Sequence, residues 1–555
     1  MASGALAWPY THLYFSSSRT IATAGPHIFV FDTEKGSVLR STTHLSENDL
    51  KQVIKSCPIH CVAVDKTFTY IATVGDDKFL KIWEVVDGES PAGLKLLNSR
   101  ELPKKPTSVI FTNDSQTILA SDKFGDVFSY SLVYTPFTTA EIEQQKLEDA
   151  KDPYASHTNP SNGTLVLGHV SPLYAIVLSQ DENYIVTADR DEHVRVSWYP
   201  QGYNVEMYCM GHRKFVSALH IPSSSPSLLI SGGGDPVLKI WDWMSGQLKG
   251  EVEIAQAVEP FAAVKKVLGK PRWLEEGGDN EGEGAGVSKR KQRRGKGKGS
   301  QQVSGPINEQ DFIDVDQPAD KPEAPRPSVN DAQPILAIKK IESIPNNEKS
   351  TFLFSAVGAT AIFCFQEPNL SDSSTSTPIS HYAFSKPVLD FACFPASSST
   401  PALVWVLLDP TWNASQDVSS TKPVAPLQLL TISESGLAEA RPEVLDRYAP
   451  LLQAVNVSTP ATVTTTESNL KALDLYADLT SFPKLAPKAP EIGAETFASS
   501  SNAERLSKRE LGRLKRTARV EEVKAKVGSK SVGGDETAGQ PEPKRTRSEP
   551  GDIVE

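Results

Sequence analysis

The densest group of chemically versatile residues in this 555-residue sequence is the run Asp189–Ser197 (DRDEHVRVS). It holds three carboxylates, two arginines and a histidine within nine residues. These residue types can support acid–base chemistry when a fold brings an acid, a base and a nucleophile together. Neither this run nor the rest of the sequence presents such a set, so we predict no catalytic residues and no metal site.

Two glycine-rich stretches, Gly232–Gly234 and Gly282–Gly286, are the candidates for a loop that cradles a nucleotide or a methyl donor. Such a loop must join a strand to the N-terminus of a helix, where backbone N–H groups point at the ligand. Neither stretch has that context, because the first lies in a strand-rich segment and the second in a polar one. We therefore predict no cofactor bound by this chain.

Three segments repeat one pattern of turn aspartate, apolar, basic, apolar and aromatic residues: Asp77–Trp83, Asp191–Ser197 and Asp235–Trp241. The last two end 241 − 197 = 44 residues apart, within the roughly 40–45 residues of a four-stranded propeller blade. Each alternates with the period of two that is typical of a half-buried strand. The pattern indicates WD-type repeats, in which the turn aspartates Asp191 and Asp235 accept hydrogen bonds and fix the blade corner.

Weaker copies of the pattern surround these three. They are Ile21–Asp32, Thr107–Leu132, Ile335–Phe365 and Val388–Ile432. A strand within Ala7–Phe15 could close the ring beside the last blade, which removes an exposed sheet edge. The sequence thus predicts an all-β, WD40-type β-propeller of about seven blades. His169 and His212, each in a Gly-His pair, are expected to be structural residues of blade corners.

The predicted propeller occupies residues 1–470, with polar insertions at about 144–162 and 272–331 that are too poor in large apolar residues to fold. Residues 471–555 are predicted to be a mostly disordered tail. Within the tail, Ala503–Val527 combines a narrow apolar stripe with many basic residues, which predicts a conditional helix. A solvated charged tail is the open alternative.

The net charge is −11, but the charge is unevenly distributed along the chain. Two runs are strongly basic, Ser288–Gly299 (SKRKQRRGKGKG) and Pro543–Arg547. Both resemble nuclear-import signals, so we expect a nuclear protein; a solvated charge run is the alternative for each. The five cysteines are scattered and odd in number, which predicts reduced thiols. No apolar run approaches the length of a membrane span, and no membrane association is expected.

The stretch Asp181–Ser217 contains more than a generic repeat requires, because Ser197 stands where other repeats have tryptophan and Asp189–Val196 precedes it. It resembles the WD-repeat, non-catalytic subunit of the eukaryotic (fungal-type) tRNA (guanine-N7)-methyltransferase complex. Ala120–Val127, Gly211–Ser217, and Leu475–Leu479 with Pro483-Lys484 are similar to further segments of that family.

The resemblance implies a heterodimer with a catalytic methyltransferase subunit that binds S-adenosylmethionine and forms N7-methylguanosine in the variable loop of tRNA. This chain would stabilise and activate that subunit, and would meet tRNA through the complex. The partner-binding residues implied are Arg190, His193 and Arg195, the last matching a basic residue that pairs with an acid of the enzyme. Lys81 and Lys239 fill the same position in other blades, so a purely structural role for Arg195 stays open.

Two other functions remain compatible with a propeller. A substrate receptor of a ubiquitin ligase often carries Trp-Asp-x-Arg at a blade end, whereas this chain has Trp83-Glu84 and Trp241-Asp-Trp-Met244. A ribosome-assembly scaffold would fit the basic runs. Identifying the stoichiometric partner of the tagged protein separates the three.

Overall fold

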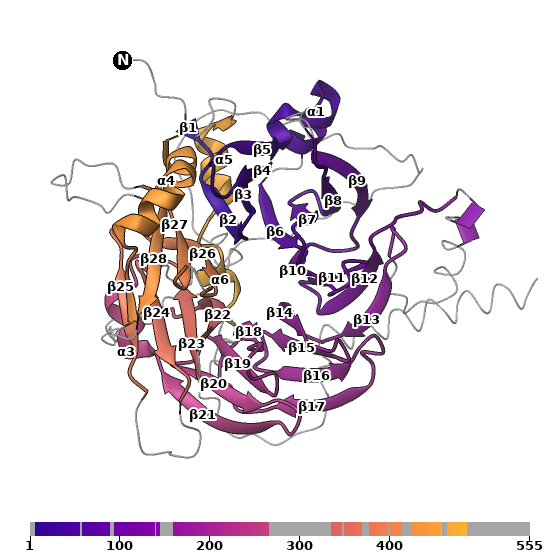
Figure 1. Ribbon diagram of the computed structural model, residues 1–555. Coiled ribbons are helices and arrows are strands. Elements are labelled where there is room, and N and C mark those ends of the chain that lie inside the picture. The colour runs from indigo at the N-terminus through magenta and orange to yellow at the C-terminus, as the bar shows by residue number, and fades with distance from the viewer. Residues whose placement is uncertain are drawn as a thin grey trace, which may run out of the picture. The chain divides into compact units, whose positions relative to one another are not determined.

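The computed structural model describes residues 6–484 with gaps at 56–57, 89–93, 139, 142, 145–158, 266–334, 347–348, 369–376, 398–399, 413–424, 434–435 and 458–462. Within these residues, seven four-stranded antiparallel sheets follow one another along the chain as the blades of a β-propeller (Figure 1). The predicted all-β propeller of about seven blades is confirmed.

Each blade is made of four consecutive strands, ordered from the centre of the ring outward. Blades 1 and 2 are β2 (Tyr10–Phe15), β3 (Arg19–Ala24), β4 (His27–Asp32), β5 (Val38–Ser41), β6 (Ile59–Val64), β7 (Tyr70–Gly75), β8 (Phe79–Val85) and β9 (Leu94–Glu101). Blades 3 and 4 are β10 (Pro106–Phe111), β11 (Thr117–Asp122), β12 (Asp126–Ser131), β13 (Thr164–Gly168), β14 (Leu173–Leu178), β15 (Tyr184–Asp189), β16 (Val194–Trp198) and β17 (Val205–Cys209). Blades 5 to 7 are β18 (Val216–His220), β19 (Leu228–Gly233), β20 (Val237–Asp242), β21 (Gln247–Glu253), β22 (Ile338–Asn346), β23 (Lys349–Ala356), β24 (Ala361–Gln366), β25 (Ser380–Ala383), β26 (Val388–Phe394), β27 (Leu403–Leu408), β28 (Leu427–Ser433) and β29 (Gly436–Glu439).

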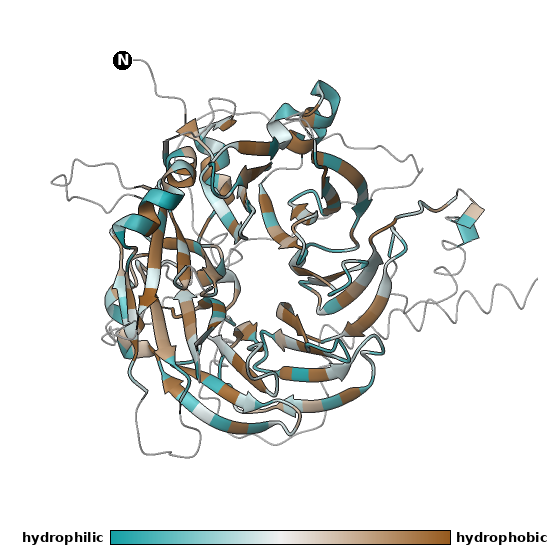
Figure 2. Ribbon diagram, in the orientation of Figure 1, coloured by the Kyte–Doolittle hydropathy of each residue, from teal (hydrophilic) through white to brown (hydrophobic). Residues whose placement is uncertain are grey.

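The second and third strands of the blades are buried on both faces, because each blade is packed between two others. In β15 and β20 all but one or two terminal residues are buried. Apolar residues accordingly follow the strands, and hydrophilic ones gather at the turns and on α1 (Glu47–Lys55) (Figure 2). Trp83 and Trp241 are among the largest of these buried side chains, and each donates its indole N–H to a hydroxyl of the neighbouring strand, Thr73 at 3.0 Å and Ser231 at 2.8 Å.

The ring closes without a strand exchanged between its first and last blades. β2 lies beside β26, as the expected strand near the N-terminus should, but it belongs to the sheet of blade 1 and not to that of blade 7. Phe15 of blade 1 stacks on Trp405 of blade 7 at 4.7 Å between ring centroids. Helix α4 (Pro442–Val457) covers this joint with Tyr448 and Leu451, and the short strands β1 (Leu6–Ala7) and β30 (Thr464–Thr465) pair outside it.

The described chain continues beyond the boundary expected at residue 470. Helices α5 (Glu467–Leu473) and α6 (Asp478–Ser481) follow β30, and the first compact unit runs to Leu485. The first compact unit thus extends fifteen residues past the boundary expected at 470 (485 − 470 = 15), because Leu473 and Leu479 are buried against the blades. The predicted helix Ala503–Val527 lies outside the described residues.

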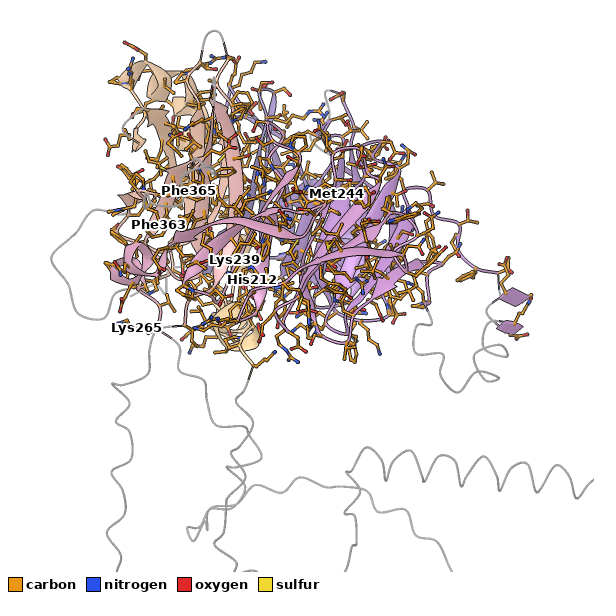
Figure 3. The ribbon with its side chains drawn as sticks, turned by 90° about the horizontal axis from the view of Figure 1, so that it is seen from below. His212, Lys239, Met244, Lys265, Phe363 and Phe365 are labelled. Carbon is orange, nitrogen blue, oxygen red and sulfur yellow. The ribbon has the colours of Figure 1, made fainter. Side chains whose placement is uncertain are left out.

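Of the two expected insertions, most positions lie outside the described residues. Asn159, near the end of the first, is buried and bonds the Tyr130 hydroxyl of β12 at 2.8 Å. The second follows α3 (Ala255–Val258) and the short 3-10 helix η2 (Glu259–Phe261), after which the chain is described to Lys265 (Figure 3). Both insertions enter between strands that the propeller pairs or packs normally.

Candidate functional site

The turn between β15 and β16 in blade 4 is organised by Asp189. One carboxylate oxygen accepts the backbone N–H groups of Asp191 and His193 at 2.8 and 3.0 Å. The other lies 3.0 Å from Nδ1 of His169, whose Nε2 is 2.9 Å from the Thr187 hydroxyl. Burial alone would raise the pKa of Asp189, but the hydrogen bonds from His169 and His193 outweigh it and lower that pKa. Burial lowers the pKa of His169, which favours a neutral imidazole that donates to Asp189.

This arrangement corrects the assignment of Asp191 as the corner acceptor of blade 4. In blade 5 the corner is as predicted from the pattern, with His212 Nδ1 at 2.7 Å from Asp235 and Nε2 at 2.7 Å from Ser231; Figure 3 labels His212 and Lys239 on this blade. Asp191 occupies the repeat position of Asp235, yet the histidine of its blade bonds Asp189 instead. A carboxylate two residues earlier has taken the contact with the histidine. Asp191 stays at the corner through Ser171: burial would raise the pKa of Asp191, but its hydrogen bonds with Ser171 and Lys484 lower that pKa.

Arg195 is buried, with 8% of its surface exposed. Its Nη1 donates to the carbonyl of Gly168 in blade 3 at 3.1 Å, and Nε has no hydrogen-bond partner. Burial lowers the pKa of the guanidinium, and the neighbouring Tyr208 opposes this. The side chain therefore ties blade 4 to blade 3, and only a small part of it is open to a second protein.

Arg190 and His193 are more open than Arg195, with about two-fifths of each side chain exposed. Arg190 lies 3.8 Å from Asp191 and lines the mouth of the central cavity. His193 bonds Asp189 at 3.2 Å, and its ring lies 6.3 Å from that of Tyr208. The turn thus brings the three predicted partner-binding residues together, but on surfaces that differ in exposure.

Sequence reasoning missed an apolar rim along the outer edge of blade 4. The rim consists of Trp198, Tyr203, Val205, Tyr208 and Met210, all exposed, with Tyr203 at 77% and Met210 at 62%. Met244 and Leu248 of blade 5 are exposed as well. Exposed aromatic and methionine side chains gathered in this way are typical of a surface that binds another protein. The signal available in the sequence was the apolar segment 205–210 (VEMYCM), which an outermost strand does not need.

Ser197 changes the joint between blades 3 and 4. Its hydroxyl is buried with no hydrogen-bond partner, and no indole crosses to Thr187 as Trp241 does to Ser231 in blade 5. The loop before β17 approaches β13 instead, since a Cβ on Gly202 would lie 2.6 Å from the carbonyl oxygen of Val166. In blade 4 a small serine stands where other blades have tryptophan, and the loop that contains Gly202 lies close to blade 3.

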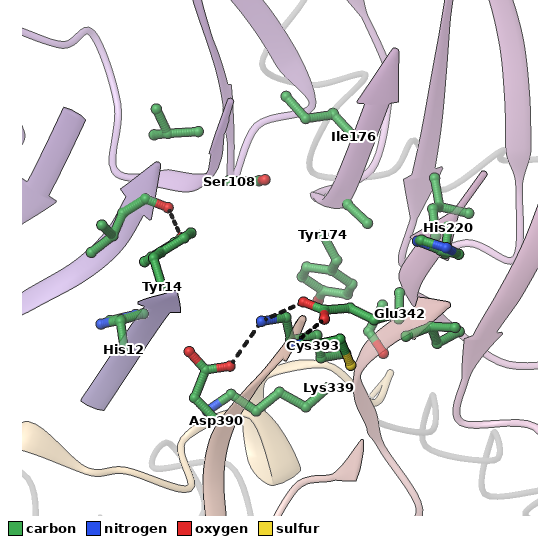
Figure 4. A pocket seen from close by; sticks show the side chains of 18 of the residues that line it. His12, Tyr14, Ser108, Tyr174, Ile176, His220, Lys339, Glu342, Asp390 and Cys393 are labelled. Atoms are coloured by element: carbon green, nitrogen blue, oxygen red, sulfur yellow. Dashed lines mark hydrogen bonds and ion pairs between the residues drawn. The ribbon is translucent and has the colours of Figure 1, made fainter. Parts of the chain in front are cut away.

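The centre of the ring holds a cavity of about 600 Å³ (Figure 4). The Lys340 ammonium lies there between Glu342 at 2.8 Å and Asp390 at 3.2 Å, and Asp390 also accepts the backbone N–H of Leu13 at 2.9 Å. These contacts join blades 6, 7 and 1. Every charge in this cluster has a partner within the protein, so the geometry indicates a structural joint.

The structure explains the glycines that resembled a nucleotide loop. A Cβ on Gly233 would lie 2.0 Å from the carbonyl oxygen of Phe215, so Gly233 allows two backbones of blade 5 to approach, while Gly232 and Gly234 leave room for the side chains of Leu238 and Phe215. Among the residues that the structure describes, no group of three or more His, Cys, Asp or Glu is placed to hold a metal ion. In the same part of the chain, no helix is long and apolar enough to cross a membrane.

The fold and the blade corners define a WD-repeat propeller whose fourth blade differs from the others. The sequence matches the family described as "tRNA methyltransferase TRM82 WD40 domain" over residues 33–160 and 138–430. This chain belongs to that family.

Its curated relatives carry names from the same system. The "tRNA (guanine-N(7)-)-methyltransferase non-catalytic subunit trm82" of Sclerotinia sclerotiorum is 30% identical over 269 residues, 42% of this chain and 52% of that protein. The protein of the same name from Aspergillus clavatus is 35% identical over 238 residues, 36% of this chain and 47% of that protein. The subunit named wdr4 from Dictyostelium discoideum is 35% identical over 213 residues, 38% and 43% of the two chains. The matched part spans about half the length of these relatives.

Proposed function

We propose that this chain is the non-catalytic subunit of a tRNA (guanine-N7)-methyltransferase, which binds the catalytic subunit through blade 4 and holds it in its active conformation. The membership in the TRM82 family and the names of its relatives support this role. A partner that prefers the competent state of an enzyme shifts the enzyme's population towards that state. In this proposal S-adenosylmethionine is bound by the catalytic subunit and not by this chain.

The observation that carries the choice of blade 4 is its apolar rim. Tyr208 and Met210 lie at the end of β17 that is nearest to His193, so the rim adjoins the turn Arg190–His193. A docking surface needs apolar side chains that lose water on binding and polar ones at its edge that set orientation. The rim supplies the first, and the turn supplies the second.

The test mixes the purified chain with its catalytic subunit and measures methyl transfer to tRNA. We expect no transfer by this chain alone and a large stimulation of the catalytic subunit when the chain is added. Met210→Glu should weaken association at least about tenfold, because it places a charge in an apolar contact. Ile54→Glu on the exposed face of α1 is the matched control and should bind as the unchanged chain does.

Turnover by this chain alone would contradict the non-catalytic role. Unchanged binding by Met210→Glu would move the interface away from blade 4. If affinity purification returned ligase adaptors or pre-ribosomal particles in place of a methyltransferase, the alternative propeller functions would replace this one.

We also propose that the protein is nuclear, on the basis of the basic runs Ser288–Gly299 and Pro543–Arg547, which lie outside the described residues. Replacing the basic residues of both runs by serine in a fluorescent fusion should shift the fusion to the cytoplasm. Unchanged nuclear accumulation would show that neither run is needed.

A further inference from the structure

The segment Leu473–Lys484, which we call the strap, crosses one mouth of the central cavity after the propeller is complete. At its start Leu473 is buried with residues of blades 1 and 7. The Tyr476 hydroxyl donates to Asp409 at the end of blade 7, at 2.7 Å. Leu479 is buried with Phe215 of blade 5 and residues of blade 6. The strap therefore runs from blade 7 across to blade 5.

An aromatic contact anchors the far end of the strap. The Phe482 ring lies 4.2 Å from that of Tyr174 in blade 4 and 5.5 Å from that of Phe215. Tyr174 also donates its hydroxyl to the carbonyl of Ser481 at 3.2 Å. Two aromatic contacts and a hydrogen bond thus hold the end of the strap against blades 4 and 5, because stacked or edge-on aromatic pairs stabilise a contact beyond the burial of their surface.

Beyond this anchor Lys484 reaches the turn of blade 4. Its ammonium lies 3.2 Å from Asp191 and 3.1 Å from Glu192. Asp191 faces both Ser171 and Lys484, while His169 bonds Asp189 in its place. Blade 4 thus differs from blade 5 in two linked contacts. Its corner histidine bonds Asp189, and Asp191 bonds Lys484, whereas in blade 5 the histidine bonds Asp235.

Glu192 has a φ of 75°, as Lys78 has 61° at the same place in blade 2, whereas blade 3 has Gly125 there. The left-handed conformation is less favourable for a residue with a side chain than for glycine, so a contact with the Glu192 side chain helps to hold it. A cation held beside Asp191 and Glu192 stabilises this conformation and keeps Arg190 and His193 on either side of it in fixed positions.

We propose that Lys484 is a positioning residue, through which the strap holds the turn Arg190–His193 in the conformation that the catalytic subunit recognises. The inference rests on the proposed function, because it concerns how the same docking site is prepared. Lys484 acts in this account through the turn and has no contact with the reacting atoms.

The test measures the affinity of the full chain for the purified catalytic subunit, together with the thermal transition of the free chain. Lys484→Glu should weaken binding about fivefold and make it less sensitive to salt than in the unchanged chain, because salt screens the ion pair that the change removes. The melting temperature should change little, since an exposed ion pair adds little to global stability. Lys484→Arg should restore binding. Lys471→Glu is the matched control, because Lys471 pairs with Glu467 in the neighbouring helix and not with the turn.

A charge exchange separates positioning from direct contact. Glu192→Lys combined with Lys484→Glu restores an ion pair between these two positions, while Asp191 stays beside the new carboxylate. Binding should therefore recover in part relative to Lys484→Glu alone. Absence of any recovery in the double variant would mean that Lys484 meets the partner itself. Equal binding by Lys484→Glu and the unchanged chain would overturn the inference and leave the proposed function standing, whereas failure of the unchanged chain to bind would overturn the proposed function.

Two truncations give an independent reading. A chain ending at Leu485 keeps the strap and should bind as the full chain does. A chain ending at Ala472 lacks the strap and should bind at least about tenfold more weakly, since both the aromatic anchor and Lys484 are gone. Equal affinities of the two truncated chains would contradict the role of the strap.

Discussion

At the scale of single residues, the fourth blade shows how one carboxylate can change what its neighbours do. Asp189 bonds His169 and two backbone N–H groups, so Asp191 does not take the histidine and bonds Lys484 instead. The family resemblance marked Arg195 as an interfacial cation, but its side chain is buried and donates a hydrogen bond to the carbonyl of Gly168. Of the three residues that the family resemblance marked as partner-binding, Arg190 and His193 are exposed enough to contact a partner.

The burial of Arg195 changes what its charge reversal should do. The family resemblance implies a partner-binding role for Arg195, in which case Arg195→Glu would weaken association and leave the propeller folded. In the structure the change removes the bond to Gly168 and places a carboxylate near Asp189, so the free energy of unfolding should fall by about 3 kcal/mol. Chemical denaturation measures this, with Arg195→Lys as the control that keeps the charge. An unchanged denaturation midpoint would show that the side chain is free to leave the joint.

His27 makes the stability of blade 1 depend on pH. It is 4% exposed, and burial lowers its pKa from 6.5 to about 4. The unfolded chain binds the proton first as pH falls, so stability is full above pH 6.5 and is lost towards pH 4, by at most about 3 kcal/mol. Denaturation at pH 7 and pH 4.5 should show a smaller difference for His27→Gln than for the unchanged chain. An equal difference would mean that this histidine is protonated in the folded state.

At the scale of elements, the outer strand β17 and the strap contribute differently to blade 4: β17 carries part of the apolar rim, and the strap contacts the turn before β16. β17 carries the exposed Tyr208 and leads to Met210, and the strap ends at the turn that precedes β16. Both contributions come from side chains and not from the pairing of strands. The segment Ala503–Val527 is a third element of interest, and it lies outside the described residues.

Deleting Ala503–Glu555 tests the basic segment. Basic residues of the segment can contact RNA phosphates, and each such contact adds to the salt dependence of binding. They include Arg505, Lys508, Arg509, Arg513, Lys515, Arg516 and Arg519. We expect the shortened chain to associate with the catalytic subunit normally, while the complex binds tRNA more weakly and with a shallower dependence on salt. Titration of tRNA at several salt concentrations measures both. Identical affinity and slope would exclude the segment as an RNA contact.

At the scale of the whole molecule, the propeller depends on a joint between blades that are far apart in sequence. Asp390 of blade 7 accepts the N–H of Leu13 from blade 1 and bonds Lys340 of blade 6. No strand is exchanged between the first and last blades, so the contact between them depends on side chains and on a helix. The contributors are Asp390, the Phe15–Trp405 stack and helix α4.

Replacing Asp390 should therefore destabilise the ring as a unit. Asp390→Ala leaves a buried N–H without an acceptor and Lys340 with a single carboxylate, which should cost about 3 kcal/mol. The thermal transition should move to lower temperature, and hydrogen exchange should rise in β2 and β26 before it rises in blade 4. Uniform exchange across all blades would show that closure is not localised at this joint.

The sequence by itself determined the propeller, because turn aspartates, paired Gly-His residues and period-two strands recur at the spacing of a blade. It also singled out the fourth blade, since Ser197 and the charged run before it depart from that pattern. These are local properties, and each can be judged from neighbouring residues alone.

Only the tertiary structure decided which residues face a partner. Asp189 and Asp191 are equally good acceptors in sequence, and the choice between them depends on where His169 lies. Arg195 is buried because Gly168 belongs to the neighbouring blade, and the strap is ordered because Phe482 meets Tyr174. Such contacts join residues distant in sequence, so their energies depend on how the blades pack and not on any local pattern.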